Sequence, residues 1–246
     1  MTSSFAFSND APKLRTQAIP TTDPSAGLKL TEIFYSLQGE GLTSGLPTIF
    51  IRLTGCPLRC SYCDTTYSFT GGVRLSLDDI LADIAQYPCK RVCVTGGEPL
   101  AQPNAIALMK LLIDQGYEVS LETAGALSVK EVPVQVSKVM DLKTPSSGEC
   151  KRNLWENLDY LTAHDQLKIV IADRTDYEWA VAKLWEFDLH KKCGVVWFSP
   201  MFEIDERKSD VPNIAIQLAE WILADGLPVR LQLQLHKIIW ADARGK

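Results

Sequence analysis

Short apolar runs alternate along the chain with segments whose apolar residues recur at helical spacing. One such segment begins at Ser76, which has the position of an N-cap with Asp79 as its capping-box partner, and apolar residues then recur from Leu77 to Ile84. Further helices are expected over residues 103–115, 175–189 and 212–225. The runs that predict strands are 28–37, 47–53, 91–95, 118–123, 138–142, 167–172, 194–198 and 229–235. Alternating strands and helices predict βαβ units and a largely parallel sheet.

Composition divides the chain into a short leader and one long unit. Residues 1–27 are rich in Ser, Thr, Pro and Ala and show no sustained period, so we expect a flexible N-terminal leader. Residues 28–246 are long enough for a single domain with one substantial core, because α/β barrels reach this size as one unit. No apolar stretch has the length of a membrane span and no signal peptide is visible, so a cytoplasmic protein is expected.

The charge balance argues for a small-molecule substrate. The net charge is -5 at pH 7, and nothing in the sequence provides the strongly basic field that non-specific nucleic-acid binding requires. We therefore expect no direct contact with nucleic acid.

Three of the seven cysteines stand together in the spacing Cys-x3-Cys-x2-Cys, as Cys56, Cys60 and Cys63. Three thiolates on one loop can hold three corners of a [4Fe-4S] cluster and leave one iron without a protein ligand. The remaining cysteines stand singly, at Cys89, Cys93, Cys150 and Cys193. A zinc site with a distant histidine as fourth ligand is the alternative, and the available histidines are His164, His190 and His236.

Polar clusters fall repeatedly where predicted strands end. They are Thr95–Pro99, Glu122–Gly125, Asp141–Pro145, Ser199–Pro200 and Gln234–Lys237, and the cysteine loop follows a strand in the same way. In β/α barrels, catalytic loops gather at the edge of the sheet where the parallel strands end. Because convincing helices are fewer than the predicted strands and the chain is short for a complete set of eight strand–helix pairs, the sequence predicts a partial, open TIM-like β/α barrel of class α/β.

Two further features add candidate binding groups. Arg52 interrupts an apolar strand, and a cation in that position either pairs with a carboxylate or binds an anionic ligand. In Gly96-Gly97-Glu98-Pro99, two glycines would let the main chain approach a ligand, and Glu98 adds negative charge.

The cysteine spacing, with Tyr62 before the third cysteine, and the Gly-Gly-Glu-Pro sequence resemble the radical S-adenosylmethionine (SAM) superfamily. That resemblance implies that the open iron binds SAM and that the reduced cluster cleaves SAM to a 5'-deoxyadenosyl radical. From about residue 30 to 240, the chain looks like the 7-carboxy-7-deazaguanine synthase family. The residues that carry this second resemblance are Ser36–Gly41, Phe50–Leu53, Cys63–Thr65, Gly96–Pro99, Glu122–Thr123, Gln234, His236 and Lys237.

The resemblance implies a ring contraction of 6-carboxy-5,6,7,8-tetrahydropterin to 7-carboxy-7-deazaguanine with loss of ammonia, on the route to queuosine in tRNA. By analogy, the cluster is held by Cys56, Cys60 and Cys63, and Mg²⁺ is bound by Thr65. The residues that contact SAM are Gly96, Gly97, Glu98, Glu122, Lys143 and Ser199 by the same analogy. Those that contact the pterin are Gln38, Glu40, Arg52, Thr95 and His236. Flavodoxin or a similar reductant and a homodimeric state are the expected partners.

The chain departs from the family pattern at three places. Leu235 replaces the threonine of the usual Gln-Thr-His, ten residues follow His236, and Asp141–Pro145 stands where some members carry Ser-Pro-Lys. Two alternatives remain open: an activase that installs a glycyl radical on a partner protein, and a non-enzymatic iron-sulfur or zinc module.

Overall fold

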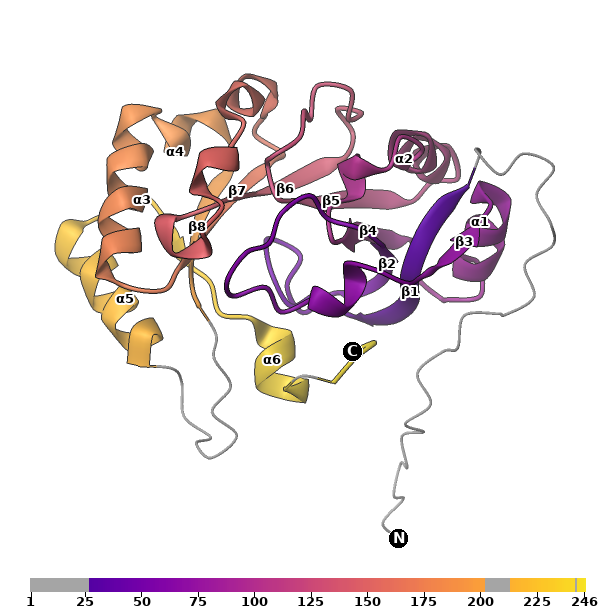
Figure 1. Cartoon of the computed structure of the whole chain (residues 1–246), viewed down its shortest axis with the longest axis horizontal. Helices are drawn as coiled ribbons and strands as arrows, with labels where there is room; N and C mark the ends of the chain where they lie inside the picture. Colours follow the sequence, from indigo (N-terminus) through magenta and orange to yellow (C-terminus); the bar gives the residue numbers. More distant parts are fainter. Residues whose placement is uncertain (1–26, 202–212, 242) are drawn as a thin grey trace, which may run out of the picture.

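A computed structural model describes residues 27–201, 213–241 and 243–246. The strands are β1 (Leu28–Leu37), β2 (Pro47–Leu53), β3 (Val73–Leu75), β4 (Arg91–Gly96), β5 (Glu118–Thr123), β6 (Ser137–Leu142), β7 (Gln166–Ile171), β8 (Val195–Pro200) and β9 (Arg230–Leu231). In this part of the chain they form one sheet of nine strands in the order β3-β1-β2-β4-β5-β6-β7-β8-β9 (Figure 1). The sheet is open, which confirms the predicted partial barrel.

The sheet is parallel from β2 through β9, as the alternation of strands and helices predicts. Only β1 runs the other way, antiparallel to both β2 and β3. Strand β3 was not predicted, because its three residues directly follow the Gly71-Gly72 turn and carry too little pattern to indicate a strand.

The helices are α1 (Leu77–Ile84), α2 (Ala105–Asp114), α3 (Arg174–Glu186), α4 (Leu189–Lys192), α5 (Asn213–Asp225) and α6 (Leu235–Trp240). Short 3₁₀ turns lie at Thr66–Ser68, Pro99–Ala101, Pro145–Ser147, Cys150–Arg152 and Trp155–Tyr160. The predicted capping box of α1 is present: the Ser76 side chain accepts from the Asp79 backbone N–H at 3.0 Å, and the Asp79 carboxylate accepts from the Ser76 N–H at 3.3 Å.

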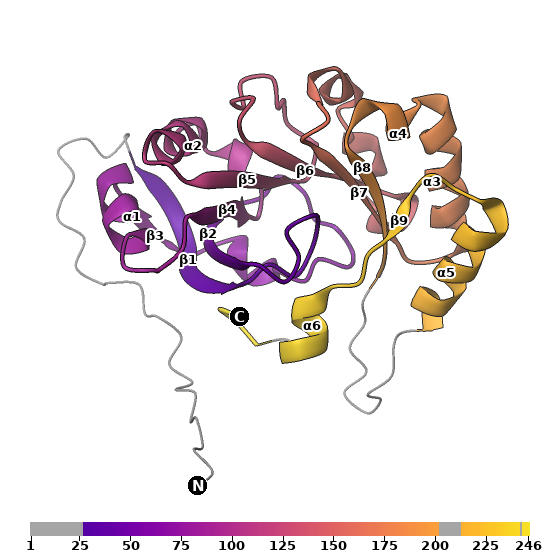
Figure 2. The ribbon, with the colours of Figure 1, turned by 180° about the vertical axis from the view of Figure 1, so that it is seen from behind.

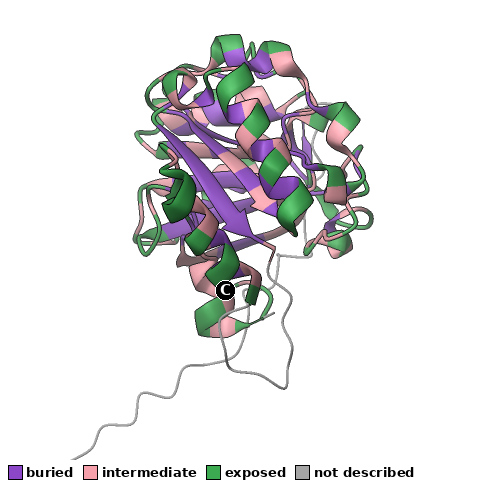
Figure 3. Ribbon diagram, turned by 90° about the vertical axis from the view of Figure 1, so that its left-hand side faces the viewer, coloured by how far each residue is buried: buried purple, intermediate pink, exposed green. Residues whose placement is uncertain are grey.

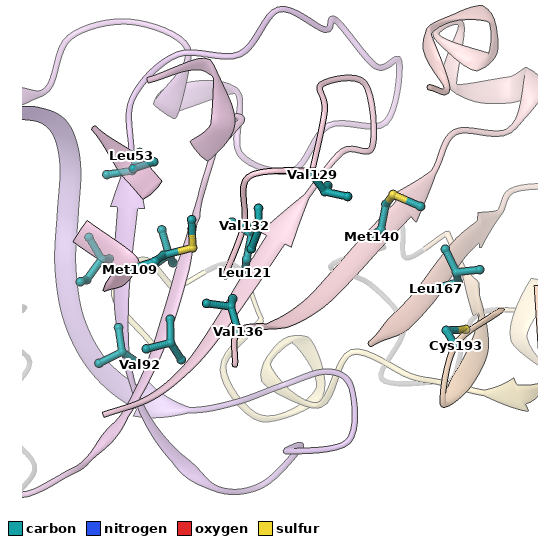
Figure 4. Packing of buried hydrophobic residues seen from close by; sticks show 14 of the residues in the cluster. Leu53, Val92, Met109, Leu121, Val129, Val132, Val136, Met140, Leu167 and Cys193 are labelled. Atoms are coloured by element: carbon teal, nitrogen blue, oxygen red, sulfur yellow. The ribbon is translucent and has the colours of Figure 1, made fainter. Parts of the chain in front are cut away.

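The helices α1, α2, α3 and α5 lie along the outer side of the curved sheet, whereas α6 lies at its open side (Figures 1 and 2). The strands are largely buried, and the helices turn their exposed residues outward (Figure 3). Apolar side chains between sheet and helices form the core, where Met109 of α2 lies among strand residues such as Val92 and Leu121 (Figure 4). The inner side of the sheet is thereby left available for a site.

The last predicted strand, residues 229–235, is largely wrong. Only Arg230 and Leu231 pair with β8, and Leu235 already begins α6. The chain leaves the sheet at Gln232, whose side chain instead accepts from the Gly41 backbone N–H. His236 therefore lies in a helix and not at a strand end.

Apart from Gly27, the expected N-terminal leader lies outside the described residues. Within the described ranges, no helix combines the length and the apolar character that crossing a membrane would require.

Candidate active site

Six neighbouring parallel strands each contribute a polar residue to the inner side of the sheet. These residues are Arg52 of β2, Thr95 of β4, Glu122 of β5, Asp141 of β6, Lys168 of β7 and Ser199 of β8, and all of them line one pocket of about 290 Å³. Side chains alternate between the two faces of a strand, so adjacent residues such as Leu53, Val94 and Leu121 belong to the core. The alternation separates a polar inner face from an apolar outer one.

Two loops close this pocket at opposite edges of the sheet. The cysteine loop follows β2, at the edge where the parallel strands end. The loop between β1 and β2 lies at the other edge, because the Leu42 backbone N–H donates to the side chain of Gln166, the first residue of β7, at 2.9 Å. A ligand in the pocket would lie between the two loops.

The cysteine loop presents Cys56, Cys60 and Cys63 as free, partly exposed thiols to the pocket. Burial raises the pKa of both Cys56 and Cys60, so cluster ligation would require loss of these protons. The Leu58 backbone N–H lies 3.4 Å from the Cys56 sulfur, a contact that would stabilise a ligating thiolate.

These three thiols suit a cluster better than a single ion. In the described part of the chain, no three His, Cys, Asp or Glu side chains converge as ligands of one metal ion. A [4Fe-4S] cluster requires no such convergence, because each cysteine binds a different iron. The alternative zinc site with a histidine ligand is therefore not formed among these residues.

The segment after β6 supports the cysteine loop. The backbone N–H of Ser61 donates to the Ser147 carbonyl at 3.0 Å, and its hydroxyl donates to the Ser146 carbonyl at 2.6 Å. The hydroxyls of Tyr62 and Thr144 are 3.2 Å apart. Lys143, in the same segment, forms an ion pair with Asp141 and also lines the pocket.

Gly96 and Gly97 allow two loops of the protein to approach each other. A Cβ on Gly97 would collide with the Gly55 carbonyl, and the Glu98 backbone N–H donates to that carbonyl at 2.8 Å. A Cβ on Gly96 would likewise meet the backbone of Leu53. We expected these glycines to make room for a ligand, and the structure shows that internal packing also requires them.

Glu98 does not line the pocket and is fully buried. Its carboxylate accepts hydrogen bonds from the backbone N–H of Leu100 at 3.0 Å, the N–H of Ala124 at 2.7 Å and the hydroxyl of Thr123 at 2.9 Å. Burial raises its pKa, while these hydrogen bonds oppose the shift. The carboxylate therefore links two strand-end loops, and a contact with SAM at this position would have to come from the main chain.

Arg52 pairs with a carboxylate and also faces the pocket. Its Nε donates to the Glu32 carboxylate at 2.7 Å, and the Tyr67 hydroxyl donates to the same oxygen at 2.9 Å. The Arg52 side chain also lines the pocket. The ion pair fixes the guanidinium, which carries further N–H donors for an anionic ligand.

Glu40 is held by three side chains. Lys168 forms a short, buried ion pair with its Oε2, Gln232 donates to the same oxygen at 3.2 Å, and Gln234 donates to Oε1 at 2.6 Å. Burial alone would raise the pKa of Glu40, but the charge and hydrogen bond of Lys168, with the hydrogen bond from Gln234, hold it at about 2. Neither Lys168 nor Gln232 was predicted from the sequence as a site residue.

His236 reaches the pocket from α6 and lies against Gly39. Burial lowers the pKa of His236, although Glu40 and Asp64 oppose this shift. The imidazole is therefore neutral near pH 7.

The pKa of Glu122 is shifted in the opposite direction to that of Glu40. Burial raises its pKa to about 8; the charge of Lys168 opposes this, and the charges of Glu40 and Asp141 add to it. Glu122 therefore retains a proton near neutral pH.

Apart from Glu98, every residue that the sequence analysis proposed for the site lines this pocket. These are Gln38, Glu40, Arg52, Cys56, Cys60, Cys63, Thr65, Thr95, Gly96, Gly97, Glu122, Lys143, Ser199 and His236. Cys93 is buried and contributes to the pocket wall as well.

Comparisons with known proteins agree with this geometry. Residues 50–138 match the radical SAM superfamily. The 7-carboxy-7-deazaguanine synthase of Koribacter versatilis is 45% identical over 87% of this chain and 97% of its own length. That of Chlorobaculum tepidum is 42% identical over 89% of this chain and 98% of its own length.

A solved structure gives the same indication. The crystal structure of QueE from Escherichia coli superposes with a TM-score of 0.68 at 25% sequence identity, covering 85% of this chain and 95% of the QueE chain. On the identity and coverage of its relatives, the chain belongs to the 7-carboxy-7-deazaguanine synthase family of the radical SAM superfamily.

Proposed function

We propose that this protein contracts the ring of 6-carboxy-5,6,7,8-tetrahydropterin to 7-carboxy-7-deazaguanine, with release of ammonia, in queuosine biosynthesis. The observation that carries the proposal is one pocket that joins the three-cysteine loop to Gln38, Glu40, Arg52 and His236. A concave site with several polar groups suits a small polar ring. These specific polar groups favour a small ligand over the protein substrate of an activase.

Membership in the radical SAM superfamily implies a [4Fe-4S] cluster and SAM. Bound in this pocket, they would supply a carbon-centred radical that abstracts hydrogen from the substrate. The SAM-binding residues would be Gly96, Gly97, Glu122, Lys143 and Ser199, with Glu98 stabilising their loops. Lys143 suits the SAM carboxylate, because the charge of Asp141 raises its pKa despite burial and keeps it cationic.

The pterin would lie between the β1–β2 loop and the inner face of the sheet. Arg52 suits the substrate carboxylate, because a guanidinium offers two parallel N–H donors to a planar anion. Glu40 accepts hydrogen bonds, which matches the ring N–H and amino donors of a pterin. Gln38, Thr95 and neutral His236 complete the contacts.

Mg²⁺ is also part of the proposal, with Thr65 as its protein ligand. Thr65 and Asp64 bring oxygen atoms to the pocket wall beside Cys63. Magnesium usually retains several waters and binds few protein oxygens, so one hydroxyl with the substrate carboxylate would suffice.

The remaining elements of the proposal concern the cellular setting. The cluster needs an external one-electron donor such as flavodoxin. Free cysteines at every described cysteine position favour a reducing, cytoplasmic compartment. Exposed Ile216 and Leu223 on α5 are candidate contacts of a homodimer.

The test compares two substrates with the anaerobically reconstituted and reduced protein in the presence of SAM and Mg²⁺. Mass spectrometry should detect 7-carboxy-7-deazaguanine from the 6-carboxylated tetrahydropterin and no ring contraction of the tetrahydropterin that lacks the carboxylate. Equal conversion of both substrates would contradict the role of Arg52. Conversion of neither, with SAM still cleaved, would overturn the substrate assignment.

A further inference from the structure

Lys168 has a position in the pocket that the proposed function leaves unexplained. It is one of the six polar residues on the inner face of the sheet, and it lies on β7 beside Asp141 of β6. Its side chain is only 11% exposed, and burial of a lysine is costly unless a partner compensates the charge. The compensating partner is Glu40, which lies in the β1–β2 loop, at the edge of the sheet opposite the cysteine loop.

The Glu40 carboxylate of the Lys168–Glu40 pair is held from several sides. Glu40 receives three side-chain hydrogen bonds, from Lys168, Gln232 and Gln234. A carboxylate has about four acceptor positions, so roughly one remains for a ligand N–H. The orientation of Glu40 is thus fixed by the protein before any ligand arrives.

Gln232 connects this carboxylate to the SAM side of the pocket. Its amide nitrogen lies 3.2 Å from Glu40 Oε2 and 3.3 Å from the Ser199 hydroxyl, while its amide oxygen accepts from the Gly41 N–H at 2.5 Å. The side chain is 6% exposed. A displacement of Glu40 would therefore also disturb Gly41 and Ser199.

We propose that Lys168 is a positioning residue for the pterin. Its ammonium holds the Glu40 carboxylate in place, and Gln232, which contacts both Glu40 and Ser199, couples the position of Glu40 to the SAM-binding wall of the pocket. This inference rests on the proposed function. It assigns Lys168 an indirect role, because the ligand contact that it controls is made by Glu40.

Lys138 offers an internal comparison for the role of Lys168. It forms another buried ion pair, with Asp165 at 3.0 Å, and neither residue lines the pocket. Asp165 also accepts from the backbone N–H groups of Lys138 and Thr162, so this pair organises the chain around β6 and β7. The two pairs share their burial and chemistry and differ in whether a ligand could reach them.

The experiment uses the reconstituted holoenzyme and measures four quantities: iron content, SAM cleavage, and KM and kcat for 6-carboxytetrahydropterin. In Lys168→Met we expect an increase in KM of about tenfold or more, because misplacement of a binding group is costly, while iron content and SAM cleavage persist. The matched control Lys138→Met should lower the thermal unfolding temperature and leave KM unchanged. An unchanged KM in Lys168→Met would overturn the inference.

Removal of one partner leaves a buried, unpaired carboxylate, so each single variant has a charge-neutral companion. These are Lys168→Met with Glu40→Gln, and Lys138→Met with Asp165→Asn. The first double variant should recover thermal stability but not pterin affinity, and recovery of both would show that the pair serves only the fold. If wild-type holoenzyme neither binds nor converts the pterin, both the proposed function and this inference are overturned. If wild type is active and Lys168→Met is unaffected, only this inference is overturned.

Discussion

His236 lies so close over Gly39 that a methyl group on Gly39 would occupy the space of the imidazole. The adjacent backbone N–H of Leu235 donates to the Gly39 carbonyl at 3.0 Å. The first turn of α6 and the β1–β2 loop thus form one wall of the pocket, although nearly the whole chain separates them in sequence. The missing side chain at Gly39 is what allows the imidazole to lie there.

This contact predicts the effect of Gly39→Ala. The added methyl group should displace His236 and raise the KM for the pterin about tenfold, since misplaced binding groups weaken productive geometry. Cluster content should be unchanged, because the cysteine loop lies at the other edge of the sheet. Steady-state kinetics and iron analysis provide the measurement.

A second variant identifies the cause of that effect. If crowding of the imidazole is responsible, Gly39→Ala should add little to the KM of a His236→Ala protein. Fully additive effects of the two substitutions would contradict the proposed contact.

Cys60→Ala should abolish the cluster. With only two of the three loop cysteines left, the visible absorbance and the EPR signal of a reduced [4Fe-4S] cluster should be lost after reconstitution, along with SAM cleavage. Cys150→Ala is the control, because Cys150 is also free and partly exposed but does not line the pocket. Equal iron and sulfide incorporation in Cys60→Ala and wild type would refute the ligand assignment.

Glu98→Gln should lower stability. The amide has one acceptor oxygen for three donors, so a buried donor loses its partner, at a cost of about 1–3 kcal/mol in unfolding free energy. Glu118→Gln is the surface control, since the Glu118 side chain is 72% exposed and its ion pair with Arg91 should contribute little. Chemical denaturation measures both, and a Glu98→Gln protein as stable as wild type would show that its carboxylate is not needed between the loops.

Glu122 predicts a pH dependence of stability in the protein without SAM or pterin. Its pKa in the folded state is raised to about 8, so its stabilising contribution is complete below its ordinary pKa of 4.5 and is lost as the pH rises through about 8. Glu122→Gln removes this titration, and its unfolding temperature should fall less than that of wild type between about pH 5 and pH 8, the interval between the ordinary and the raised pKa. Parallel curves for the two proteins would contradict a raised pKa.

Local pattern predicted most of the strands and the polar clusters at their ends, whereas most individual pocket residues were predicted from the resemblance to the family. Arg52 was recognised because a cation stands in an apolar run, and Lys168 in Leu167-Lys168-Ile169 carries the same signal, which was overlooked. In β7, Lys168 alternates with buried residues, as a strand with one polar face should.

Other features have no local signal. Gln232 contacts Gly41 and Glu40 across about 190 residues of sequence, and only the folded chain brings them together. The same contacts explain why the segment after Leu231 leaves the sheet despite its strand-like pattern. The role of Glu98 was missed for a similar reason, because its partner Thr123 lies on the next strand.

The most direct test of the central claim is the stoichiometry of the reaction. Reduced holoenzyme supplied with SAM, Mg²⁺ and 6-carboxytetrahydropterin should form 7-carboxy-7-deazaguanine and ammonia in equal amounts, both lost in Cys60→Ala. Cleavage of SAM to 5'-deoxyadenosine while the pterin remains intact and no ammonia appears would leave a radical SAM enzyme with a different substrate, and would contradict the proposed function.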